Sequence, residues 1–386
     1  MCIINNRTMP YIVYHQSLNS SLTTTSADSE EYSGTILWFV INILLILVTV
    51  LGNLLTISAI LSTRKLNSII ANQFIFSLAV SDLLVGLTIP YHMAFYVVPD
   101  FGSGKINCLL RFVLISFACS SSIMNLLMIA ADRYVAIVYP LHYNRLITRK
   151  TSIFSSVFVW GLSFAVSAIP LSWNEWEPGK QCEIFEVIPN SYMNMVLFPM
   201  FLLIWLMMLL LYSRICREAA GQAKRMRVAT TMQNISGLRD SKSFQVMLTI
   251  LGCFTVCWLP YFIIALYNRF HANLKSGYSY EVAFNLAVAN SSMNPIIYAW
   301  KNHNFRQSFL HLIRCRSPNQ QACAQFVTNH VPSKKSSISN GVGNAACDVD
   351  DGESDSGKRA DLEMGVADCC NGGSNVTNGG GRIDRE

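Results

Sequence analysis

Apolar residues along this chain form seven long blocks, which are separated by short polar segments. The blocks cover residues 35–61, 69–98, 106–138, 152–171, 193–212, 243–266 and 282–300. A helix needs roughly twenty apolar residues to cross a bilayer core about 30 Å thick, and each block provides such a stretch. Packed helices of a soluble protein would instead carry a polar face. The pattern therefore predicts an all-α membrane protein, a seven-transmembrane helix bundle.

The two ends of the chain are polar and differ from this central region. The pattern predicts an extracellular N-terminal tail over 1–35, a seven-transmembrane domain over 36–316 and a cytoplasmic tail over 317–386. The last segment is rich in Gly, Ser, Asn and Asp, so it is expected to be disordered. Composition agrees with a membrane protein, because 52% of the residues are hydrophobic and 13% are charged, against roughly 25% charged in soluble domains.

Basic residues in the short loops predict the orientation of the bundle. Arg64 and Lys65 follow the first block, and Arg149 and Lys150 follow the third, whereas the loops on the other side carry few Lys and Arg. Because basic loops remain in the cytoplasm, the N-terminus is expected outside, in a multi-pass protein of the plasma membrane. The net charge of +6 follows from this topology, so no nucleic-acid partner is expected.

The outer face is expected to carry covalent modifications. Asn6 and Asn19 begin Asn-X-Ser/Thr triplets in the N-terminal tail and are predicted to be glycosylated. Cys108, at the outer start of the third block, and Cys182, in the second outer loop, both face an oxidising compartment. We therefore predict a disulfide between them, which would pin the loop over the helices.

Several polar side chains lie within the apolar blocks, where a charge is costly and usually functional. Asp82 lies in the second block, Ser122 in the third, and Asn290 and Asn294 in the seventh. Their oxygen atoms suit a small hard cation. An allosteric sodium ion is predicted here and no other cofactor, with a purely structural hydrogen-bond network as the alternative.

An acidic and basic triplet, Asp132-Arg133-Tyr134, stands at the inner end of the third block. Arg133 can pair with Asp132 or with Asp240, at the cytoplasmic start of the sixth block. Breaking a pair between Arg133 and Asp240 as the sixth helix moves would make a two-state latch. The triplet alone is a weak signal, because it occurs by chance in many proteins.

Two prolines are expected to bend neighbouring helices. Pro260 follows Trp258 in the sixth block, and Pro295 lies between Asn294 and Tyr298 in the seventh. Proline cannot donate a backbone hydrogen bond and clashes with the preceding turn, so it kinks a helix. The two kinks can serve as hinges between the outer and inner ends of the bundle, or they can be static.

These motifs, in this order and each on its expected helix, resemble the rhodopsin-like (class A) G protein-coupled receptors. The resemblance covers about residues 36–315 and includes a short amphipathic eighth helix at Phe305 and Arg306, with Cys315 as a palmitoylation site. It implies a receptor that binds an extracellular ligand and activates heterotrimeric G proteins. Arrestin, receptor kinases and membrane lipid are further partners that the resemblance implies.

The resemblance also implies roles for particular residues. Arg133 and Tyr134 would face the G protein. Tyr212 and Tyr298 would stabilise the active state, and Trp258 would form the base of the ligand pocket.

Within the family, the adenosine receptors are the branch that this chain resembles most. Four segments resemble those of adenosine receptors and their melanocortin and cannabinoid relatives: the second inner loop, 140–148, and the segments 185–193, 212–215 and 290–309. An asparagine, a histidine and a proline of that branch are replaced in this chain, by Ala265, Val288 and Ile204.

The expected ligand pocket has a mixed polar and apolar lining. It comprises Ile115, Cys119, Phe185, Glu186, Trp258 and Asn268. Amine receptors carry an aspartate where this chain has Ile115, and opsins need a lysine that 278–300 lacks, so both ligand classes are disfavoured. We expect adenosine or a related small molecule, with a peptide or a lipid as the alternative.

Other classes of function fit the sequence less well. No set of nucleophile, base and metal ligands converges at one depth among the blocks, so an enzyme is not expected. A transporter or channel would more often show internal repeats or interrupted helices, and it would leave the Asp132 to Tyr134 triplet without a role.

Overall fold

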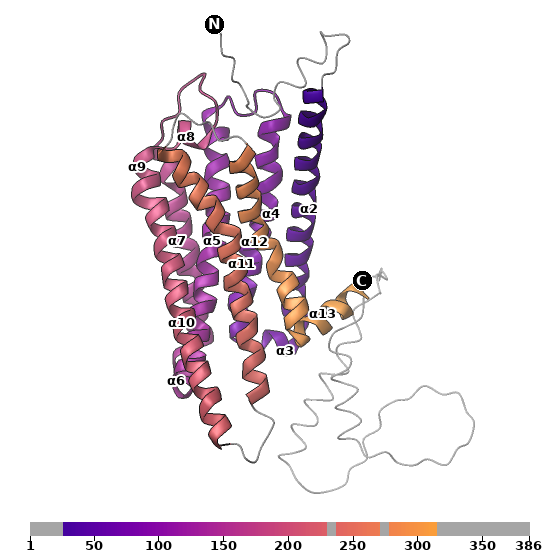
Figure 1. The fold of residues 1–386 in the computed structure, drawn as a ribbon, viewed down its shortest axis with the longest axis vertical. Coiled ribbons are helices and arrows are strands. Elements are labelled where there is room, and N and C mark those ends of the chain that lie inside the picture. Colours follow the sequence, from indigo (N-terminus) through magenta and orange to yellow (C-terminus); the bar gives the residue numbers. More distant parts are fainter. Residues whose placement is uncertain (1–25, 230–236, 271–277, 315–386) are drawn as a thin grey trace, which may run out of the picture. The chain divides into compact units, whose positions relative to one another are not determined.

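The computed structural model describes residues 26–229, 237–270 and 278–314, with side chains over 36–221, 249–268 and 279–314. Within these ranges the chain forms long helices that lie side by side (Figure 1). They are α2 (Ser26–Ser62), α4 (Ala71–Val97), α5 (Lys105–Val138), α7 (Arg149–Ser172), α10 (Phe198–Ala229), α11 (Gly237–Phe270) and α12 (Tyr278–Lys301). Each coincides with one of the seven apolar blocks, so the predicted all-α bundle is confirmed.

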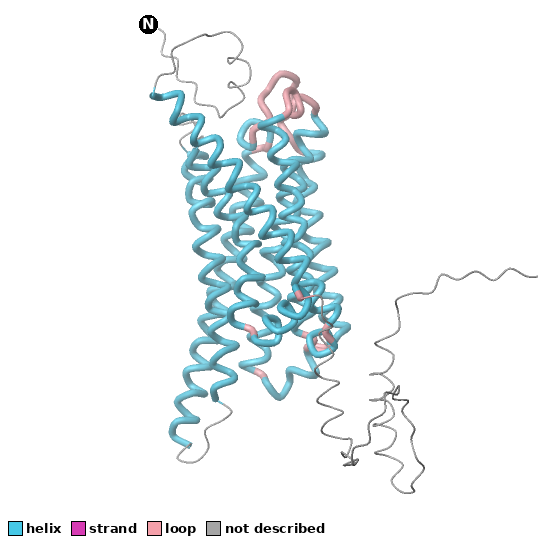
Figure 2. Tube along the Cα trace, turned by 90° about the vertical axis from the view of Figure 1, so that its right-hand side faces the viewer, coloured by secondary structure: helices cyan, strands magenta, loops and turns pink. Residues whose placement is uncertain are grey.

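Short helical elements connect the long helices, and loops are confined to the helix ends (Figure 2). These elements are α3 (Arg64–Asn67), α6 (Pro140–Leu146), α8 (Ile184–Val187), α9 (Asn190–Tyr192), the π-helical turn η1 (Met193–Leu197) and α13 (His303–Ile313). The last of these is the expected eighth helix. The Asn302 side chain caps its start by accepting from the backbone N–H of Asn304 at 3.1 Å, and Phe305 and Phe309 are buried against the bundle.

The helix α12 is less apolar than the others. Among the described residues, six helices are long and apolar enough to cross a membrane, and α12 is not one of them. The reason is its run of polar side chains, which includes Asn290, Ser291 and Asn294, all of them buried. These side chains face other helices and not lipid, so α12 serves as the seventh helix of the bundle with a polar inner face.

Three local features differ from the sequence expectation. The helix α2 begins at Ser26, inside the segment expected to be a tail. The second inner loop contains α6, which starts at Pro140, as suits a residue without a backbone N–H at a first helical turn. The fifth block opens with η1, and Pro199, two residues after this turn, cannot donate to the preceding turn, which favours a locally widened helix.

Close approach of the helices depends on two glycines. A Cβ atom at Gly86 in α4 would lie 2.9 Å from Cγ2 of Val50 in α2, and one at Gly52 in α2 would lie 3.0 Å from Cγ of Pro295 in α12. Small residues at such crossings bring backbones together, and in lipid this packing takes the place of the hydrophobic driving force. Gly52 and Gly86 therefore hold α2 against α4 and α12.

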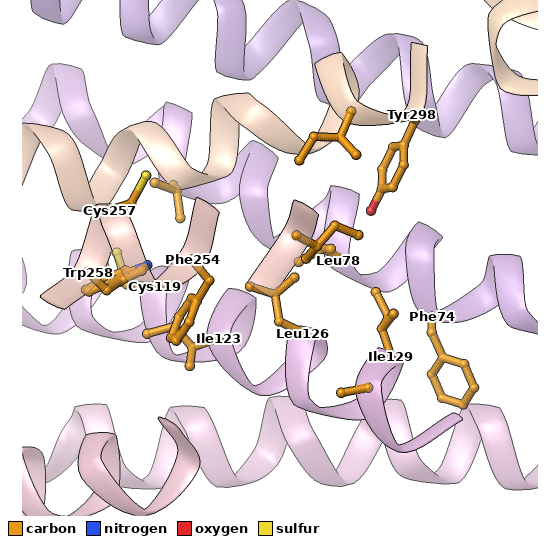
Figure 3. Packing of buried hydrophobic residues seen from close by; sticks show 14 of the residues in the cluster. Phe74, Leu78, Cys119, Ile123, Leu126, Ile129, Phe254, Cys257, Trp258 and Tyr298 are labelled. Carbon is orange, nitrogen blue, oxygen red and sulfur yellow. The ribbon is translucent and has the colours of Figure 1, made fainter. Parts of the chain in front are cut away.

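A large hydrophobic cluster fills much of the interior of the bundle, and part of it is drawn in Figure 3. It extends from Trp258, Cys257 and Phe254 of α11, past Ile123 and Leu126 of α5, to Tyr298 of α12. Because protein interiors are close-packed and resist gradual deformation, movement at one end of this cluster requires repacking along it.

Candidate functional site

A cavity of about 530 Å³ lies between the helices. Its lining comes from α4, α5, α7, α10, α11 and α12 and from the loop that contains α8. All six residues expected in the ligand pocket line it: Ile115, Cys119, Phe185, Glu186, Trp258 and Asn268. Volumes of this size are typical of small-molecule sites, which span roughly 300–1,000 Å³.

The predicted disulfide between Cys108 and Cys182 is present. It ties the start of α5 to the loop that carries Phe185 and Glu186, and Cys182 itself lines the cavity. The cross-link therefore holds the loop against the cavity.

Trp258 lines the cavity in a cluster of aromatic rings. Its ring centre lies 6.3 Å from that of Phe201 and 6.1 Å from that of Tyr261. Phe201 and Phe262 stack with ring centres 3.3 Å apart, which joins α10 to α11 two residues after Pro260. A ligand that touches this cluster would contact the segment of α11 where Pro260 removes a backbone hydrogen bond.

Charged groups at the cavity include two that the sequence analysis did not single out, Arg111 and Glu281. The buried Arg111 guanidinium donates to His92 at 3.1 Å, to the Tyr96 hydroxyl at 2.7 Å and to the carbonyl oxygen of Cys182 at 3.1 Å. An arginine inside the third apolar block was itself a signal of function. Glu281 lies one residue before the seventh block, so the apolar pattern gave no reason to place it in a pocket.

A second group of polar side chains surrounds Asp82, which is fully buried. Ser122 donates to one carboxylate oxygen of Asp82 at 2.6 Å, and Asn294 donates to the other at 2.7 Å. Asn290 is also buried, and its Nδ2 atom finds no hydrogen-bond partner in the described part of the chain.

Asn53 and Asn125 extend this polar group. The Asn53 side chain donates to the carbonyl oxygen of Ser291 at 3.1 Å and so links α2 to α12. The Oδ1 atom of Asn125 is buried and receives no hydrogen bond from the described residues. The centre of the bundle thus holds one carboxylate, a hydroxyl oxygen that contacts it and a free amide oxygen, a donor set that fits a small hard cation.

Two residues of the Asp132-Arg133-Tyr134 triplet contact each other and the second inner loop. Arg133 forms an ion pair with Asp132, and its Nε donates to Asp132 at 2.8 Å. The Tyr143 hydroxyl from α6 donates to the other oxygen of Asp132 at 3.0 Å and accepts from Arg133 at 3.4 Å. Burial, followed by the negative charge of Asp132, raises the pKa of Tyr143 to about 12, so this hydroxyl keeps its proton.

The remaining residues predicted from the sequence have fewer described contacts, or lie outside the described part of the chain. Tyr134 contacts the ring of Tyr139 at 6.0 Å, while Tyr212 and Tyr298 are buried in the core. Of the proline motif, Pro295 lies inside α12 beside Gly52. Asn6, Asn19 and Cys315 and the side chain of Asp240 lie outside the described residues.

Comparison with known proteins assigns the family. The model of the family described as "7 transmembrane receptor (rhodopsin family)" matches residues 52–298. The histamine H2 receptor of Canis lupus familiaris is 34% identical, with 72% of this chain and 79% of that receptor covered. The human histamine H2 receptor is 33% identical over the same shares, and the human alpha-1A adrenergic receptor is 28% identical over 75% of this chain and 71% of the receptor. The chain belongs to the rhodopsin family of membrane-embedded, multi-pass receptors.

The comparisons correct the expected branch. These relatives are histamine and adrenergic receptors, so the predicted adenosine branch is not supported. Three of the segments that suggested it, 140–148, 212–215 and 290–309, lie away from the cavity, whereas 185–193 contributes to its lining. Likeness in these segments did not identify the ligand class, and the dismissal of amine ligands, which rested on Ile115 alone, has to be reconsidered.

Proposed function

We propose that this chain is a receptor that binds a small extracellular ligand in the cavity and activates heterotrimeric G proteins at its inner end. The observation that carries the proposal is the cavity itself, since its lining includes Trp258, two residues before Pro260 in α11. A peptide or lipid is less well suited to it, because the volume of about 530 Å³ is that of a small-molecule site.

The relatives favour one class of small molecule. Two of them are named for histamine, and the third is named as an adrenergic receptor. An amine is thus the ligand class to test before nucleosides, even though Ile115 provides no carboxylate for it.

Activation follows from a shift between two states. The contacts among Asp132, Arg133 and Tyr143 support a closed inner end, in which the guanidinium is held by its own helix and by α6. A ligand that binds more tightly to a state with α11 displaced would raise the population of that state. Arg133 and Tyr134 would then be free to contact the G protein, with Tyr212 and Tyr298 packing behind them. Asp240 is the proposed second partner of Arg133 in the closed state.

A sodium ion would favour the closed state. We assign its ligands to Asp82, Ser122, Asn290 and Asn294, and the buried free oxygen of Asn125 supports an oxygen-rich site at the same depth. When bound, the ion would supply positive charge beside the one buried carboxylate of this group.

The topology that accompanies this function has the N-terminus outside and the C-terminus in the cytoplasm of the cell. Glycosylation at Asn6 and Asn19 and palmitoylation at Cys315 belong to the same proposal, as does binding of arrestin and receptor kinases.

The test is guanine-nucleotide exchange on purified heterotrimeric G proteins, measured in membranes that contain the full chain. Ligands are histamine, phenylethylamine, adenosine and a small set of lipids and peptides. A saturable rise in exchange with one of them, lost in Arg133→Ala at equal surface expression, is the expected result. No exchange above empty membranes, with or without ligands, would refute coupling to G proteins.

A further inference from the structure

The carboxylate of Glu281, in the cavity lining, accepts from the Tyr96 hydroxyl and keeps its other oxygen atom without a partner in the described part of the chain. Glu281 lies in the first turn of α12, and its Oε2 atom is buried without a hydrogen-bond partner among the described residues. A buried acceptor without a donor is costly, and a ligand donor would remove that cost. The positive end of the helix dipole also favours a negative charge at this position.

Arg111 lines the same cavity and its charge attracts this carboxylate, but it donates no hydrogen bond to the Oε2 atom. Its guanidinium is engaged by neutral groups, namely His92, the Tyr96 hydroxyl and the Cys182 carbonyl, and it lies over the Phe95 ring at 4.6 Å. No ion pair joins Arg111 to Glu281 in the part of the chain with described side chains. These neutral groups accept from each of the three guanidinium nitrogens of Arg111, while Glu281 keeps one acceptor atom without a donor among the described residues.

Aromatic rings line the cavity next to Glu281. Tyr280 precedes it in α12, and its ring centre lies 5.6 Å from that of Phe185 and 5.3 Å from that of Tyr261. The ring centre of Phe284, three residues after Glu281, lies 5.9 Å from that of Tyr261. Aromatic faces attract organic cations, so a carboxylate among them is chemically suited to an alkylammonium group.

The position that carries the carboxylate of amine receptors is the apolar Ile115 in this chain, and Ile115 lines the same cavity. We infer that the ligand is a small primary or secondary amine and that Glu281, on α12, holds its ammonium group in place of an acid on α5. This inference rests on the proposed ligand cavity and names the class of molecule that it takes.

The arrangement also connects the ammonium site to the kinked helix. The hydroxyls of Tyr280 and Tyr261 are 2.9 Å apart and so join α12 to α11, and Tyr261 packs edge-on against Trp258. An amine on an aromatic or apolar body would bind Glu281 at one end and reach the Trp258 ring cluster at the other.

The experiment measures thermal stabilisation of the purified full chain and nucleotide exchange with the same compounds. The probes are histamine, phenylethylamine and tryptamine, each beside its N-acetyl derivative and the carboxylic acid of equal length. The inference expects at least one amine to raise the melting temperature and stimulate exchange, and acetylation to abolish both effects. This arm needs no substitution, so it does not depend on the folding of a variant.

The second arm compares Glu281→Gln with Glu177→Gln. Glu177 is an outer-loop glutamate that pairs with Lys180 at 3.1 Å and does not line the cavity. Removing the charge partner of a buried ammonium is expected to weaken potency at least about thirtyfold in Glu281→Gln, while Glu177→Gln leaves it unchanged.

Several results would overturn the inference. They are stabilisation by the acids or acetylated compounds in preference to the amines, unchanged amine potency in Glu281→Gln, loss of potency in Glu186→Gln alone, and no binding by any amine. Exchange stimulated by a compound that is not an amine would overturn the inference and still support the proposed receptor function. Absence of any exchange would count against the receptor function itself.

Discussion

The Tyr143 hydroxyl donates a hydrogen bond of 3.0 Å to the carboxylate of Asp132, whose other oxygen is paired with Arg133. A residue of the second inner loop thus completes the contacts around the Asp132–Arg133 ion pair of α5. Because the hydroxyl accepts from Arg133 as well, its removal would weaken both partners.

Replacing Tyr143 with Phe is therefore expected to raise basal nucleotide exchange. A net contribution of about 1 kcal/mol from one such hydrogen bond corresponds to about a fivefold change in the population of the open state. Since the pKa of Tyr143 is about 12, its hydroxyl stays protonated and the wild-type basal rate should show no titration of this residue between about pH 6 and 9. Tyr91→Phe, which removes a hydroxyl hydrogen bond at the outer end of α4 and outside the cavity, serves as the control, and equal basal rates in both variants would contradict this role.

Asp240→Ala is expected to raise basal exchange by a similar factor if Asp240 restrains Arg133 in the closed state. The physical reason is the loss of an opposite charge near the guanidinium, which remains paired with Asp132 alone. Basal exchange and surface expression are measured in parallel, with Asp240→Glu as the charge-conserving control. A basal rate unchanged from wild type would show that the closed state does not depend on this latch.

Sodium dependence should disappear in Asp82→Ala. In the wild type, sodium chloride in place of an equal concentration of choline chloride is expected to lower agonist affinity several-fold, because the ion binds the closed state. Without the carboxylate no charge remains to hold the ion, and Ser122 and Asn294 lose their shared acceptor. Agonist competition in both salts is the measurement, and a persistent sodium effect in the variant would place the ion elsewhere.

Gly86→Ala should destabilise the receptor by about 1–3 kcal/mol, the typical cost of overpacking a well-packed interior. The added Cβ would lie 2.9 Å from Val50 and 3.1 Å from Thr49, so α2 would have to move away from α4. Gly161→Ala in α7 is the matched control, because nothing lies within 4 Å of its added Cβ. The melting temperature of the detergent-solubilised protein should fall in the first variant and stay or rise slightly in the second. A fall of equal size in both would point to helix propensity and not to packing.

The sequence by itself determined where the helices lie, which two cysteines form the disulfide and which family the chain belongs to. The seven apolar blocks, the disulfide between Cys108 and Cys182 and the family followed from length, composition and motif order, because bilayer thickness imposes a fixed length on each span. The apolar pattern did not predict local changes of helix geometry, such as the π-helical turn before Pro199.

Only the tertiary structure brought Glu281, Arg111 and the aromatic residues of α11 and α12 to one cavity. The sequence pattern could not predict this site, because the residues lie on different helices. The apolar pattern of one helix does not show which neighbouring helix its polar side chains contact. The same limit misdirected the ligand prediction. Segments compared one at a time, one of them at the cavity and the others away from it, suggested the adenosine branch, whereas the ligand is chosen by side chains that converge only after the helices pack. The order of apolar and polar residues in the sequence specifies the helix bundle, and the packing of the helices decides which charged side chains meet inside it.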